Sequence, residues 1–275
     1  MRETIYSLIA LLSTFVGSLT GMGGGIIMKP LIDLLGDYGS EGASMLSSCA
    51  VLAMSLVNVA RRVIGAAAKK RKEGAGEADA QREPEQSEVP ASRLITLALG
   101  STVGGYAGQV IFDALSGSSS SVKQVQNAVM AALVLVIFFY MLFSARLPRF
   151  HFKAVAVYAL VGVALGVISS FLGIGGGPVN VAVLTLMFSM DIKTAVFASL
   201  LSVLFTQTTK LLTVLITKGV SPFMQEMMPF MIAGAVIGGF AGALVVKKLS
   251  KKTVRIIFCA LQVVVFAVCI INIFR

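Results

Sequence analysis

The sequence predicts an all-α integral membrane protein, because of its composition and because of how its apolar residues are distributed. Of 275 residues, 56% are hydrophobic and 13% are charged, whereas about a quarter of the residues in a soluble domain are charged. Too little polar surface is left to cover a fold of this size in water, so most of the chain is expected to lie in a lipid bilayer. The apolar runs that predict helices are residues 5–19, 26–35, 42–60, 94–112, 125–145, 154–172, 179–190, 194–217, 223–246 and 254–274.

The net charge of +10 does not indicate a nucleic-acid partner. Most Lys and Arg residues stand in short clusters between the apolar runs, without interleaved aromatic residues. Such clusters orient polytopic membrane proteins and contact anionic lipid head groups. The expected partners are therefore the lipid bilayer and a small solute, not nucleic acid.

The sequence offers no pattern for catalysis or for a resident cofactor. Cys49, Cys259 and Cys269 are isolated within apolar runs, and His151 is the only histidine. No CxxC pair, catalytic constellation or ATP-binding motif is recognisable. We expect a protein that is not an enzyme and that has neither a metal site nor a cofactor.

The chain is an internal duplication. A shift of 152 residues places Gly21–Gly25 on Gly173–Gly177, and a shift of 134 places Gly100–Gly108 on Gly234–Gly242. Each unit contains a glycine-broken apolar segment, a long helix, a glycine-spaced helix and a final helix. Duplicated units of this kind are common in secondary transporters.

The two units are expected at residues 1–145 and 150–275, and the first includes a charged loop at about 67–92, inside the polar stretch 61–93. If the broken segment of each unit folds back as a re-entrant hairpin, each unit crosses the membrane three times and the repeats are inverted. If that segment crosses fully, the protein has eight spans and parallel repeats. The inverted arrangement places most Lys and Arg residues on one face, so the positive-inside rule favours it and places 61–93 in the cytoplasm.

The glycine-rich breaks are the main candidate for a binding site. A helix interruption in hydrocarbon is tolerated where it lines a cavity, because an unpaired amide there costs several kcal/mol. The helix start after each break offers free N–H groups and the positive end of the helix dipole, which together favour an anion. The alternative is that the glycines only permit tight helix packing. The candidate scaffold residues are Gly21, Gly23, Gly24, Gly25, Gly173, Gly175, Gly176 and Gly177.

Two lysines lie within apolar runs, where charge is costly and often functional. Lys29 follows the first break by one turn, and we predict that its ammonium contacts the anion. The alternatives are an ion pair with Asp33, four residues further on, or an ammonium that reaches out to the membrane surface. Lys210 follows a polar patch, and it either extends the anion path or reaches outward.

Neutral donors are candidate ligands as well. The side-chain amides of Asn180 and Gln207 and the hydroxyls of Ser47 and Ser199 can donate hydrogen bonds to an oxyanion. Ser and Thr hydroxyls in helices also bond their own backbone, so each of these residues is a weak indication on its own.

The second glycine set is predicted to be a packing face. Residues 100, 104 and 108 and their counterparts 234, 238 and 242 are spaced by four, which places each set along one helical stripe. Small residues at this spacing let helices approach closely in lipid. This helix is expected to lie against the hairpin of its own or of the other repeat.

The segments 21–30 (GMGGGIIMKP) and 171–181 (FLGIGGGPVNV) resemble the TauE/SafE family of sulfite-exporter-like membrane permeases. The resemblance implies a multi-pass transporter of the plasma membrane that carries sulfite, sulfonates or related organosulfur or organic anions. It also implies that the glycines of both breaks form the scaffold of the substrate site. Lys29 and the 67–92 loop lie outside the shared motif, and Pro30 has no counterpart in the second unit, where Ala182 stands.

The predicted function is secondary transport of a small anion by alternating access around the paired half-helix starts. The alternative is an anion channel with the same glycine-lined site. A coupling ion such as a proton or sodium is an expected partner, and a homo-oligomer remains open.

Overall fold

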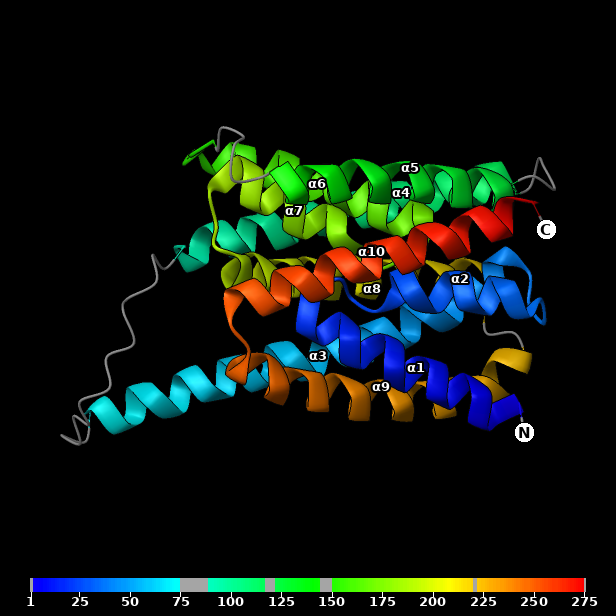
Figure 1. Cartoon of the computed structure of the whole chain (residues 1–275), viewed down its shortest axis with the longest axis horizontal. Coiled ribbons are helices and arrows are strands. Elements are labelled where there is room, and N and C mark those ends of the chain that lie inside the picture. Colours follow the sequence, from blue (N-terminus) through cyan, green and yellow to red (C-terminus); the bar gives the residue numbers. More distant parts are fainter. Residues whose placement is uncertain (1, 75–88, 117–121, 144–149, 220–221, 275) are drawn as a thin grey trace.

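The computed structural model describes residues 2–74, 89–116, 122–143, 150–219 and 222–274, and within them it is all helical (Figure 1). The helices lie close to the predicted apolar runs. Their bounds are α1 (Arg2–Thr20), α2 (Gly25–Leu35), α3 (Ser40–Gly74), α4 (Ala91–Ser116), α5 (Val122–Phe143), α6 (Val155–Leu172), α7 (Gly177–Phe188), α8 (Ile192–Lys218), α9 (Pro222–Lys248) and α10 (Lys251–Phe274).

Eight helices of the described segments are long and apolar enough to cross a membrane, and α2 and α7 are the two short ones. Large apolar side chains point outward on many of the long helices; Leu160 of α6 is 70% exposed and Ile216 of α8 is 81% exposed. Polar side chains are instead buried along α3 and α8. An apolar exterior around a polar interior is the pattern expected for a protein whose solvent is lipid.

Helices α1 and α2 form a hairpin rather than one bent rod. In Figure 1 α2 runs back toward the end of the molecule at which α1 begins, and the glycine-rich break lies inside. A Cβ atom built on Gly24 would lie 2.8 Å from the backbone oxygen of Ser13. Residues eleven apart on a continuous helix would be about 16 Å apart, so the chain reverses at the break.

Helices α6 and α7 form a second hairpin, which enters from the opposite end of the molecule (Figure 1). The two breaks therefore approach one another in the interior from opposite directions.

The glycine-spaced helices pack across the two halves of the chain. Helix α4 lies along α6, where a Cβ on Gly100, Gly104 or Gly108 would meet a backbone oxygen of α6. In the same way α9 lies along α1, where a Cβ on Gly234, Gly238 or Gly242 would meet the backbone oxygen of Ser7, Leu11 or Phe15. The prediction of a packing face is confirmed, and each face lies against the hairpin of the other half.

Because each glycine-spaced helix packs against the other half of the chain, eight helices form two groups, each with members from both halves. Helices α1, α2, α3 and α9 pack together, and we call them the first bundle; α4, α6, α7 and α8 pack together and form the second bundle. The bundles meet where α3 crosses α8, and α5 and α10 pack against each other beside them.

The polar stretch 61–93 is shorter as a loop than predicted. Helix α3 continues to Gly74 and α4 begins at Ala91, because the residues that follow Arg62 are rich in Ala, Lys and Arg, which favour helix. The acidic part of the predicted loop, residues 75–88, lies outside the described residues.

The packing predicts opposite effects of the same substitution at two helical glycines. Gly104→Ala should destabilise the protein by about 1–3 kcal/mol, because its Cβ meets the backbone oxygen of Val163. Gly65→Ala, whose Cβ has nothing within 4 Å, should be neutral or stabilise by up to about 1 kcal/mol. Thermal unfolding of both variants in detergent checks this, and equal melting temperatures would contradict the close α4–α6 contact.

Candidate functional site

The two glycine breaks touch in the interior. A Cβ on Gly23 would lie 2.8 Å from the backbone oxygen of Gly175, and a Cβ on Gly25 would meet the backbone oxygen of Ile174. The N-termini of α2 and α7 therefore begin beside one another, although their breaks are 152 positions apart in the sequence. Side chains larger than hydrogen would force the two breaks apart.

The backbone has a positive φ at both helix starts. Gly24 and Gly176 are the N-caps of α2 and α7, with φ values of 70° and 89°. Glycine adopts this conformation without steric cost, unlike other residues. Neither N-cap has a side-chain hydrogen bond, so the positive ends of both helix dipoles face the centre without a capping carboxylate or hydroxyl.

Ser47 and Ser199 join the two bundles at equivalent places. The Ser47 Oγ of α3 lies 3.0 Å from two acceptors, the backbone oxygens of Gly173 and Ser44, which share its one proton. The Ser199 Oγ of α8 donates to the backbone oxygen of Gly21 at 3.0 Å. Each hydroxyl binds the glycine break of the opposite bundle. Their predicted role as anion ligands stays a prediction, and these bonds give them a structural role beside it.

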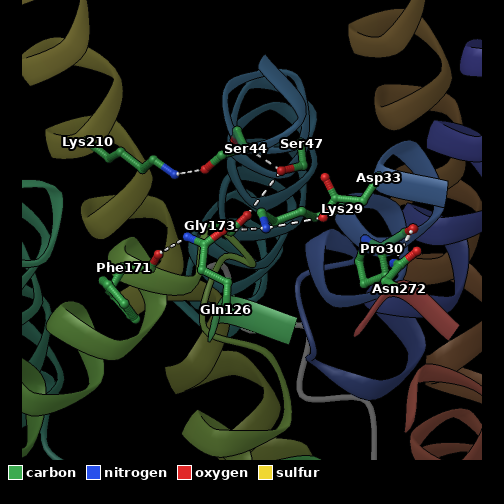
Figure 2. A network of polar contacts seen from close by, with 10 residues as sticks. All are labelled: Lys29, Pro30, Asp33, Ser44, Ser47, Gln126, Phe171, Gly173, Lys210 and Asn272. Carbon is green, nitrogen blue, oxygen red and sulfur yellow. Dashed lines mark hydrogen bonds and ion pairs between the residues drawn. The ribbon is translucent and has the colours of Figure 1, made fainter. Parts of the chain in front are cut away.

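Lys29 is fully buried and makes contacts on two sides. Its Nζ lies 3.4 Å from the Asp33 Oδ2 and donates to the Gln126 Oε1 at 2.9 Å (Figure 2). Gln126 in turn donates to the backbone oxygen of Phe171 at 2.6 Å. The ion pair with Asp33, which was one of the alternatives, is present, and the ammonium does not reach the surface; the predicted contact of Lys29 with an anion stays a prediction.

Lys210 is the second buried ammonium, and it lies at the junction of the bundles. It is 1% exposed, and its Nζ donates to the Ser44 Oγ at 2.6 Å. In Figure 2 Ser44 and Gly173 lie between the side chains of Lys210 and Lys29. Both lysines therefore approach the second glycine break, from opposite sides.

Asn180 and Gln207 are close to the same break. A Cβ on Gly176 would lie 2.5 Å from the Asn180 Nδ2, and one on Gly175 would lie 3.2 Å from the Gln207 Nε2. Both side chains are buried, and none of their amide atoms has a hydrogen-bond partner among the described residues. A buried polar group without a partner costs about 1–3 kcal/mol, so these two amides are suited to a ligand.

Asn180, Gln207 and Lys210 are not matched by the same residue types 152 positions earlier in the chain. The positions equivalent to Asn180, Gln207 and Lys210 are Met28, Ser55 and Asn58. Asn58 is already paired, since its Nδ2 donates to the Ser18 Oγ at 2.9 Å. At these three positions the second half thus offers an ammonium and two amides, whereas the first half offers a thioether, a hydroxyl and an amide that is already hydrogen-bonded.

The structure brings the predicted glycines, Lys29, Asn180, Gln207, Ser47 and Ser199 to one region. The site prediction did not include Ser44, Gln126 or Lys210. The sequence did single out Lys210 as a charge inside an apolar run, but it did not tell whether the side chain points into the protein or out of it. Ser44 and Gln126 carried none, because they become site residues only through contacts with distant helices.

The part of the chain that the structure describes has no candidate metal-binding site. No group of three or more His, Cys, Asp or Glu residues there is placed to hold a metal ion. Cys49, Cys259 and Cys269 do not form disulfides.

Eight apolar helices around a buried polar centre define a multi-pass membrane protein. The sequence profile of one family, Sulfite exporter TauE/SafE, matches residues 78–268. The match spans more than half of the chain, so the chain belongs to the TauE/SafE family and to its class of membrane transporters of sulfite and related anions. Neither the curated proteins nor the solved structures gave a significant match.

The two buried lysines predict opposite changes in stability. Lys29→Met should destabilise the protein by about 3–5 kcal/mol, because it takes the ammonium away from the buried Asp33 carboxylate. Lys210→Met should be neutral or stabilise by about 1–4 kcal/mol, because it replaces a buried ammonium bonded to a neutral hydroxyl.

Thermal unfolding in detergent, without added anions, measures both effects. Lys153→Met is the control, because Lys153 is exposed and its removal should change stability by less than about 0.5 kcal/mol. A loss at Lys210→Met as large as that at Lys29→Met would contradict the described arrangement.

Proposed function

We propose that this chain is a secondary transporter of the plasma membrane that carries a small anion, of the sulfite, sulfonate or related organosulfur or organic class, by alternating access. One observation supports this most strongly. The Lys210 ammonium and the side-chain amides of Asn180 and Gln207 converge on the glycine break at the start of α7. Ammonium, amide N–H groups and a helix N-terminus are the donors that bind oxyanions.

We propose that the site lies between the two moving parts. Lys210 belongs to the second bundle and its partner Ser44 to the first. The bonds of Ser47 and Ser199 also run from one bundle to the other. A rocking motion of the bundles would break these contacts on one side at a time and would open the site alternately to each face. The moving bodies are then the intercalated bundles rather than the two sequence repeats.

We propose inverted repeats, in which the α1–α2 and α6–α7 hairpins are re-entrant and enter from opposite faces. The hairpin paths in Figure 1 support this. The distribution of charge supports it too. In Figure 1 α4 begins and α9 ends where α3 leaves the bundle, and these terminal turns contain Arg93 and Lys248; α1 and α9 begin at the opposite end, where their first two turns contain Glu3 and Glu226 beside Arg2. The positive-inside rule then places the basic end and the 61–93 stretch in the cytoplasm.

An anion channel remains the second candidate. The same donors would serve a continuous pore, but the direct bonds across the bundle junction favour a carrier that must break them in each cycle. A gradient of a proton, of sodium or of the anion itself would drive the carrier.

Transport into proteoliposomes tests the proposal. Labelled sulfite should show saturable uptake and counterflow, and Lys210→Met should lower the initial rate at low substrate by about 10- to 100-fold, the equivalent of one charged hydrogen bond. Lys248→Met, at an exposed position of the basic end, is the matched control and should transport like the wild type. Ohmic current without counterflow would favour the channel, and wild-type uptake by Lys210→Met would refute the site.

Cysteine labelling from the two faces of the membrane tests the hairpins. Single cysteines at Glu3 and Gly36 flank the first hairpin, and those at Lys153 and Ser189 flank the second. Re-entrant hairpins predict that both members of a pair react with an impermeant maleimide from the same face, and that the two pairs react from opposite faces. Reaction of Glu3→Cys and Gly36→Cys from different faces would show instead that the first segment crosses the membrane.

A further inference from the structure

The protein interior contains few charged side chains, and their net charge can be counted. Among the described residues with buried side chains, Lys29, Asp33 and Lys210 are the charged ones, and each is at most 1% exposed. Two are cations and one is an anion, so the interior carries one positive charge in excess. Buried charge without compensation costs several kcal/mol, and this excess therefore constrains what the site can bind.

Lys29 and Asp33 compensate each other. Both are on α2, one helical turn apart, and their charged groups lie 3.4 Å from each other. Lys29 also donates to the Gln126 Oε1, which is neutral. This pair contributes no net charge to the site.

Lys210 therefore accounts for the excess. Its hydrogen bond goes to the neutral hydroxyl of Ser44. The charged or titratable groups that act on it electrostatically are Lys29, the Cys49 thiol of α3 and Asp113 of α4. Lys29 repels it. Asp113 lies in the last turn of α4, is partly exposed and accepts a hydrogen bond from Gln109, so solvent weakens its attraction.

We infer that the site selects monovalent oxyanions against divalent ones by this count of buried charge. The inference rests on the proposed anion-binding function and deepens it. One bound negative charge next to Lys210 brings the interior to neutrality, whereas a dianion leaves one negative charge without a partner. Sulfonates, hydrogen sulfite and carboxylates are then substrates in chemical class, and sulfate and the fully ionised form of sulfite are not.

The neutral donors fit the same class. Asn180 and Gln207 supply amide N–H groups near the break. They can bond the oxygens of a tetrahedral anion without adding charge. Asn180 and Gln207 would thus recognise the oxygens of the anion, while the charge of Lys210 would discriminate between monoanions and dianions.

Binding to the purified full-length protein tests the inference with two tetrahedral probes. Methanesulfonate is a monoanion and sulfate a dianion throughout the neutral pH range. Titration calorimetry should give a dissociation constant for methanesulfonate at least about 10-fold lower than that for sulfate, which corresponds to about 1.4 kcal/mol. Equal affinities, or a preference for sulfate, would overturn the charge inference and leave the proposed anion function standing. Binding of neither probe would contradict the proposed function, and the charge inference with it.

Variants that change the net buried charge should change the preference between methanesulfonate and sulfate in a defined direction. Asp33→Asn raises the excess to two positive charges and should shift the affinity ratio toward sulfate by at least about 10-fold. Glu226→Gln is the matched control, since it makes the same chemical change at an exposed position and should leave the ratio unchanged. An unaltered ratio in Asp33→Asn would overturn the inference.

A double variant keeps the test decisive if Asp33→Asn does not fold. Lys29→Met combined with Asp33→Asn removes both members of the ion pair and so leaves no lone charge from it. The charge excess stays at one, so the preference for methanesulfonate should persist even if both affinities fall. Loss of the preference in the double variant would show that Lys29 or Asp33 acts through direct contact and not through the charge count.

Discussion

The rest of this structure depends on a constraint on the backbone, which is that a helix interrupted inside a bilayer must have its free N–H and C=O groups satisfied by the protein itself. Here a long helix of the opposite bundle satisfies one backbone oxygen at each interruption. Each break presents its glycines to the other, and the hydroxyl of Ser47 or Ser199 binds a carbonyl of the opposite break. Only glycine permits both the left-handed turn and the close approach. The result is a contact at the centre of the molecule that holds two helix N-termini beside each other.

A second set of close glycine contacts intercalates the two halves of the chain. Each hairpin is held by the glycine-spaced helix of the other half, with backbone lying directly against backbone. Lipid gives no hydrophobic drive for helices to associate, so close packing of small residues is what holds them together. In the proposed rocking motion the moving units are therefore the two mixed bundles rather than the two halves of the chain. The polar residues lie where these bundles meet.

Within this symmetric frame the chemistry is asymmetric. The duplicated positions of one half hold Lys210, Gln207 and Asn180, while those of the other hold Asn58, Ser55 and Met28. Lys210 and the two amides therefore lie beside the second break, and Lys29 is the buried ammonium that follows the first. The Lys29–Asp33 pair, which has no counterpart at Val181, adds polarity without adding net charge. A single ammonium then dominates the electrostatics of the interior.

The sequence alone determined the class of protein, the positions of the helices and the two breaks, because hydropathy and glycine spacing are local properties of the chain. It also indicated Lys29, since a charge inside an apolar run stands out. It did not reveal the helical end of α3, where helix propensity outweighs polarity. The tertiary structure alone decided the partners: Lys210 and Ser44 are 166 residues apart, and Lys29 and Gln126 are 97 apart. In a helix that is apolar all round, periodicity does not tell which face turns inward, so only the packing of the bundles could bring these side chains together.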